Sequence, residues 1–137
     1  MVVYNLDYVA YLNDEILSLA IKATLKEGNK PQRTIIKTYN YNVIKNTHVS
    51  LGTLINKKNL QQQTVQDKVY SQIQKVITEN EALEKATGYS VYKRNINDSR
   101  YSLENTDTFF MNQNGYLYLV YCYGNNQYTG EFDLVIF

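Results

Sequence analysis

Two carboxylates near the end of the chain, Glu131 and Asp133, have the spacing that hydrolytic chemistry could use. Residues two apart on a strand project from the same face, and two carboxylates about 5–10 Å apart can act as acid and base on a glycosidic bond. The same spacing is more often that of two solvated charges at the start of a strand. The pair therefore makes a small carboxylate-dependent hydrolase the third of three candidate functions.

The chain has one cysteine and one histidine, Cys122 and His48. A Cys–His pair can form a nucleophile, but Cys122 lies between tyrosines in an apolar run, where burial raises the pKa of a thiol and makes it inert. A lone histidine lacks the further ligands that zinc requires, so a solvated turn is expected around His48. The sequence predicts no catalytic residue, no metal site and no cofactor.

The polar loop of residues 123–130 is the strongest candidate for a binding site. Two tyrosines flank three amides there, and such side chains can stack on a sugar ring and hydrogen-bond its hydroxyl groups, or contact a protein. The alternative is a plain turn, in which glycines allow unusual backbone angles and tyrosines pack the hairpin edge. The predicted binding residues are Tyr123, Asn125, Asn126, Gln127 and Tyr128.

The first third of the chain is typical of β-structure. Residues 2–12, 16–26 and 34–43 predict three strands, separated by a turn at 13–15 and by a break around Gly28 and Pro31. In the second of these, apolar side chains from Leu17 to Leu25 alternate with smaller or polar ones, which is the pattern of a half-buried strand. The three strands are expected to form an antiparallel meander.

The middle of the chain predicts one long amphipathic helix over residues 59–86. Asn59 can cap its start, and Gly88 is placed to end it. Apolar residues recur in steps of three and four, which puts most of them on one stripe: Leu60, Val65, Val69, Ile73, Val76, Ile77 and Leu83. After the helix, residues 90–93 are a possible short strand.

The final segment, residues 107–137, predicts a hairpin that completes the sheet. A turn at Gln113–Asn114–Gly115 separates two hydrophobic runs, and Asn-Gly between such runs is the strongest short-range hairpin signal. Residues 115–123 are apolar on both faces, which is typical of a central strand covered on one side by a helix. The fold class is therefore α+β, with an antiparallel twisted sheet packed against one long amphipathic helix.

Composition limits the possible partners. The 137 residues make a single domain (1–137), with 44% hydrophobic residues and a net charge of +1. No basic stripe favours nucleic acid, and no apolar run is long enough for a membrane span. No signal peptide is visible, and both ends read as strands, so the domain is expected to come from a longer envelope or secreted protein with an upstream segment.

Four segments carry a resemblance to a known family: residues 16–19 (ILSL), 37–41 (KTYNY), 50–54 (SLGTL) and the terminal hairpin through Phe137. The chain resembles the extracytoplasmic C-terminal domain of RsiV-type anti-sigma factors, which sense lysozyme. That domain is catalogued as one of unknown function and is similar to a module in some peptidoglycan deacetylases.

The resemblance implies a non-catalytic extracytoplasmic binding or sensor domain that docks a lysozyme-like protein or a cell-wall glycan. The alternative is an accessory domain of a cell-wall-modifying enzyme such as a polysaccharide deacetylase. Many members carry a Gly-Gly-Ala-His-like turn between the second and third strands. Here residues 24–32 read TLKEGNKPQ, without the glycine pair or the histidine, so the chain departs from the family pattern at this turn and the resemblance leaves lysozyme binding open.

Overall fold

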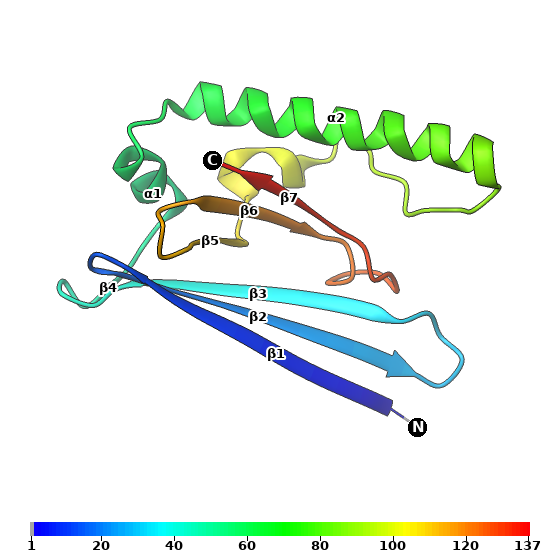
Figure 1. The fold of residues 1–137 in the computed structure, drawn as a ribbon, viewed down its shortest axis with the longest axis horizontal. Helices are drawn as coiled ribbons and strands as arrows, with labels where there is room; N and C mark the ends of the chain where they lie inside the picture. Colours follow the sequence, from blue (N-terminus) through cyan, green and yellow to red (C-terminus); the bar gives the residue numbers. More distant parts are fainter. Residues whose placement is uncertain (1) are drawn as a thin grey trace.

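The computed structural model describes residues 2–137, which form two antiparallel sheets and a long helix in three layers (Figure 1). The lowest layer is a four-stranded sheet in the order β1-β2-β3-β4, with bounds Val2–Asn13, Ile16–Glu27, Arg33–Asn42 and Thr47–His48. The three strands expected from the sequence are confirmed. The turns also lie where they were expected, since Asp14 and Gly28 both have a φ of 51°.

The terminal hairpin forms a second sheet of its own, in the order β5-β6-β7, with bounds Phe109–Met111, Leu117–Cys122 and Phe132–Ile136. The turn at Gly115 (φ 81°) and the central position of β6 are confirmed. A single continuous sheet was the wrong prediction. β5 does not pair with β3 as a strand; its main chain bonds to side chains of β3 instead. The N–H of Phe109 donates to Thr38 Oγ1 (2.9 Å), and the carbonyl of Phe109 accepts from Asn40 Nδ2 (2.8 Å).

Two helices occupy the middle of the chain, where one was predicted. Helix α1 (Leu51–Lys57) begins at Ser50, whose side chain accepts from the N–H of Thr53, and helix α2 spans Gln62–Thr87. Asn59 does not cap α2: its φ of 55° and the bond from Leu60 N to Ile55 O (3.1 Å) terminate α1 instead. The predicted end at Gly88 is confirmed, with a φ of 72°.

Helix α2 covers the second sheet with only part of its length (Figure 1). Val65, Val69 and Ile73 are fully buried, whereas Leu83 is 46% exposed. A 26-residue helix is about 39 Å long, and the strands beneath it extend only about 20 Å. The chain then returns through residues 88–98, in which 90–93 form no strand, to two short 3₁₀ turns, η1 (Ser99–Tyr101) and η2 (Leu103–Asn105).

The four-stranded sheet turns its more polar face toward the second sheet. Ser18 is fully buried, donating to Asn40 Oδ1 (2.7 Å) and accepting from the N–H of Met111 (3.2 Å). Residues paired across β1, β2 and β3 share a face, so the opposite side carries the apolar alternation of β2, from Leu17 to Leu25. We call this opposite side of β1, β2 and β3 the outer face.

Candidate functional site

The five residues expected to bind a partner lie in the β6–β7 loop but differ in accessibility. Tyr123 is 1% exposed and Asn125 is half-buried, whereas Asn126, Gln127 and Tyr128 are exposed. Only the last three have side chains open to solvent. The binding role of the loop stays a prediction, and Tyr123 and Asn125 have structural contacts described below.

Asn125 attaches the loop to the free edge of β3. Its Oδ1 accepts from the N–H of Ile36 (3.2 Å), and its Nδ2 donates to the carbonyl of the same residue (3.3 Å). The side-chain amide thus pairs with β3 as a neighbouring strand would. Arg33 adds bonds from Nη2 to the carbonyl of Asn125 (2.8 Å) and from Nε to the carbonyl of Gly124. The base of the loop is therefore fixed on the sheet.

Gly124 makes this close approach possible. A Cβ atom at this position would lie 1.9 Å from the carbonyl oxygen of Thr34 and 2.6 Å from that of Thr129. Both are backbone atoms, so neither can move aside as a flexible side chain would. Only glycine allows the loop and β3 to lie at this distance.

A polar cavity of about 410 Å³ opens beside the loop. Cys122, Asn125 and Asn126 contribute to it from the β6–β7 region, and Lys37 from β3. Its remaining walls come from the η1–β5 region and β6: Asp98, Ser99, Arg100, Asn105, Thr106, Asp107, Thr108, Val120 and Tyr121. Amide and hydroxyl groups dominate this set, and they can both donate and accept hydrogen bonds.

The charged side chains of the cavity differ in whether they form ion pairs. Arg100 Nε lies 3.1 Å from Asp98 Oδ2, and the guanidinium stacks over the Tyr123 ring at 5.2 Å. The hydrogen bond from the backbone N–H of Arg100, followed by its guanidinium, lowers the pKa of Asp98. Among residues 2–137, neither Lys37 nor Asp107 has an ion-pair partner. The cavity therefore offers a ligand one cation and one carboxylate that no ion pair occupies.

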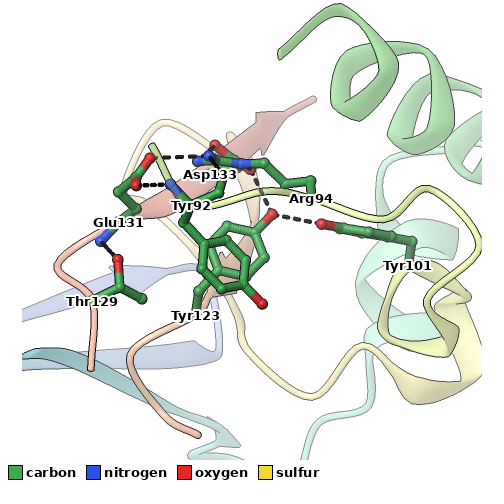
Figure 2. A network of polar contacts seen from close by, with 7 residues as sticks. All are labelled: Tyr92, Arg94, Tyr101, Tyr123, Thr129, Glu131 and Asp133. Atoms are coloured by element: carbon green, nitrogen blue, oxygen red, sulfur yellow. Dashed lines mark hydrogen bonds and ion pairs between the residues drawn. The ribbon is translucent and has the colours of Figure 1, made fainter. Parts of the chain in front are cut away.

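The carboxylates Glu131 and Asp133 do share a face, and both bind Arg94 (Figure 2). The guanidinium holds Asp133 in two bonds, Nε–Oδ2 (2.9 Å) and Nη2–Oδ1 (3.0 Å), and reaches Glu131 Oε1 through Nη1 (2.9 Å). The side chain of Arg94 is only 4% exposed. Burial disfavours its charge, but the two carboxylates outweigh that cost, and its pKa is raised.

Three tyrosines complete this network (Figure 2). Tyr123 donates its hydroxyl to Asp133 Oδ2 (2.6 Å), lies 2.7 Å from the hydroxyl of Tyr101, and stacks on Tyr92 at 4.6 Å. Burial, then the bond to Asp133, raises the pKa of Tyr123. The backbone N–H of Tyr92 donates to Glu131 Oε2 (2.5 Å), so at this residue a side chain accepts the bond that a partner strand would otherwise accept. The network thus attaches the segment after α2 to β7.

His48 and Cys122 lie far apart. His48 is exposed in β4 opposite Tyr41, with the two rings edge-on at 5.6 Å. Cys122 donates its thiol to the carbonyl of Thr34 (3.1 Å), and burial raises its pKa. Thr34 and Tyr41 are seven residues apart on one strand, about 23 Å. No group of three or more metal-ligating side chains occurs within residues 2–137.

Arg94, Lys37 and Arg100 are the charged residues that the sequence interpretation missed. A signal for Arg94 existed: Asp133 shares its strand face with Val135, which is fully buried, so this carboxylate required a counter-charge. Nothing in the sequence says that the counter-charge lies 39 residues earlier. For Lys37 and Arg100 no local signal separates them from other exposed basic residues.

Comparison of the chain with protein-family models, with curated proteins and with solved structures produced no match. Within residues 2–137, no helix combines the length and the apolar character that crossing a membrane requires.

Proposed function

We propose that the chain is a non-catalytic binding module of the extracytoplasmic cell envelope that holds a cell-wall glycan in the polar cavity. The observation that carries this proposal is the lining of the cavity: backbone-anchored Asn125, exposed Asn126 and a ring of hydroxyl and amide groups from residues 99–108. Its volume of about 410 Å³ lies in the range of small-molecule sites, about 300–1,000 Å³.

The chemistry of the cavity favours recognition by hydrogen bonds over stacking. Tyr121, the aromatic residue of the lining, is buried, and burial raises its pKa to about 12. Lys37 and Asp107, neither with an ion-pair partner among the described residues, can each form a charge-assisted hydrogen bond to a polar group of a glycan.

Calorimetric titration of solubilised peptidoglycan fragments into the protein tests this function. Lys37→Met and Asn126→Ala are each expected to weaken binding about tenfold, equivalent to about 1.4 kcal/mol for one lost hydrogen bond to a charged or polar ligand group. Lys45→Met removes an exposed lysine outside the cavity and is the matched control. Absence of both heat and a melting-temperature shift with the wild-type protein refutes the glycan proposal.

A protein partner is the second candidate, favoured by the geometry of Tyr128. Its ring is 45% exposed yet held by Lys30 Nζ at 4.9 Å and Arg33 Cζ at 5.7 Å, and its hydroxyl accepts from Lys30 (3.0 Å). An exposed but immobilised tyrosine is typical of a binding hot spot. Lysozyme in the same calorimeter tests this candidate, and Tyr128→Ala should then abolish the heat of binding.

Two alternatives remain as proposals. An accessory domain of a polysaccharide deacetylase would use the same cavity, so a covalently linked catalytic domain in the full-length protein would distinguish it. A carboxylate-dependent hydrolase is less favoured because Arg94 engages both Glu131 and Asp133. Loss of turnover of a glycan substrate in Glu131→Gln and Asp133→Asn, with folding intact, would reinstate that activity.

A further inference from the structure

The outer face of the four-stranded sheet is unusually apolar for a surface without a covering layer. β1 and β3 contribute exposed tyrosines to it, with Tyr8 69%, Tyr4 59% and Tyr39 55% exposed. Four further large apolar side chains on this face are also exposed: Val2, Leu6, Leu12 and Leu17. In Figure 1 the second sheet and both helices lie on the other side of this sheet.

Charge is absent from most of the same face. No outer-facing position of β1, or of β2 as far as Leu25, carries an ionisable acid or base other than tyrosine. A sheet with one solvated face normally alternates apolar residues inside with polar residues outside. Here the inner face holds Ser18 and Asn40, whereas the outer face holds leucine and tyrosine, together with Lys37 and Arg33 of β3. Along β1 and β2 the outer face thus has the composition of a buried surface.

The two edges of this sheet also differ in how far other parts of the chain cover them. The edge at β3 is covered by β4, by the amide of Asn125 and by the backbone bond from Thr34 N to Thr129 O (3.0 Å). The edge at β1 pairs with no other strand of residues 2–137. Asp7 is the only charged residue of β1, which contains neither lysine nor proline, the usual protection of an exposed edge.

We propose that a second copy of this chain covers the outer face, through a two-fold symmetric packing of the two four-stranded sheets. The seven exposed side chains present roughly 700 Å² of surface, close to the ~800 Å² that each partner buries in a standard interface. Along β1, and along β2 as far as Leu25, the face carries no charge and meets its own image without like-charge repulsion; its cationic positions, Lys37 and Arg33, are confined to β3. Tyr4 and Tyr8 flank the shorter Leu6 on one face, so the ridges of one copy can enter the gaps of the other.

Sedimentation of the chain of residues 1–137 between about 1 μM and about 100 μM tests the proposal. The wild-type protein is expected to sediment with twice the monomer mass over most of this range. Leu6→Lys and, on a different strand, Tyr39→Lys should each raise the dissociation constant at least about 100-fold, because each buries a charge in the interface. Circular dichroism confirms that each variant is folded before it is compared.

Two matched controls locate the interface. Leu83→Lys changes a leucine of similar exposure on α2, and Val9→Lys changes a 44% exposed residue on the inner face of β1. Both should leave the dimer intact. A wild-type protein that is monomeric at every concentration overturns the proposal, as does a dimer that Leu6→Lys and Tyr39→Lys leave unchanged. Dissociation by Val9→Lys as strong as by Leu6→Lys indicates edge-to-edge pairing of β1 and overturns the face-to-face packing.

Discussion

Replacement of Arg94 by methionine tests whether the network around Asp133 holds the return segment on the second sheet. Methionine keeps much of the apolar length of arginine and removes the guanidinium, so its bonds to Asp133, Glu131 and the carbonyl of Tyr92 are lost together. The variant therefore leaves two carboxylates next to each other with no cation between them.

The expected loss of stability follows from the burial of each carboxylate. Breaking a buried ion pair usually costs about 3–5 kcal/mol, because the remaining charge is left uncompensated. The side chain of Glu131 is 35% exposed and can regain water, whereas Asp133 is only 10% exposed and cannot. The hydroxyl of Tyr123 continues to donate to Asp133, which offsets part of the cost. We therefore expect the lower end of the range, about 3 kcal/mol.

Urea unfolding followed by circular dichroism measures this difference from the midpoint and slope of the transition. Lys75→Met is the control, because Lys75 and Glu79 form a pair at 3.8 Å with both side chains more than half exposed. That control should change the free energy of unfolding by no more than about 0.5 kcal/mol. If Arg94→Met costs less than about 1 kcal/mol, the network behaves as a solvated surface pair and the reasoning is refuted.

Two other perturbations give distinct outcomes. Gly124→Ala places a Cβ against backbone carbonyls and should lower the free energy of unfolding, measured in urea, by at least about 1–3 kcal/mol. Gly52→Ala is the control: the nearest atom to its new Cβ is 3.7 Å away, so this variant should be as stable as the wild type or slightly more stable. Equal effects of the two substitutions would contradict the close approach of the loop to β3. Burial raises the pKa of Tyr121 to about 12, so folding stability should be constant up to about pH 10 and then fall toward pH 12, by up to about 1.4 kcal/mol per pH unit. Melting temperatures measured over this range check the second prediction. Tyr121→Phe should reduce the fall without removing it, because the pKa values of Tyr123 and Tyr101 are also raised; an unchanged slope in that variant would show that Tyr121 does not contribute.

The strands and turns that local chemistry determines could be predicted from the sequence. The alternation in residues 16–26 and the Asn-Gly turn before Tyr116 act through neighbours along the chain, and both are confirmed. Helix α1 was missed although its signal is local. Ser50 is followed by Leu51, Leu54 and Ile55 at helical spacing, and Asn59 is the left-handed residue that follows its end.

The arrangement of the layers could not be predicted in the same way. A period of two shows which residues share a face of a strand but not which face the rest of the chain covers. The inner face was decided by hydrogen bonds that main-chain N–H groups of β5 donate to the hydroxyls of Ser18 and Thr38, about 70 to 90 residues earlier in the chain. The candidate cavity has the same origin, since Lys37, Arg100 and Asn126 meet only after the two sheets have stacked.

The side-chain amide that covers the edge of β3 has a consequence for biosynthesis. Asn125 is made 89 residues after Ile36, so the ribosome releases β3 long before its cover exists. During that interval both edges of the meander are open, which is the condition that favours pairing between nascent chains. Folding of the four-stranded sheet is therefore expected to depend on residues 125–137, and truncation within the β6–β7 loop should yield aggregates rather than a stable β1–β4 sheet.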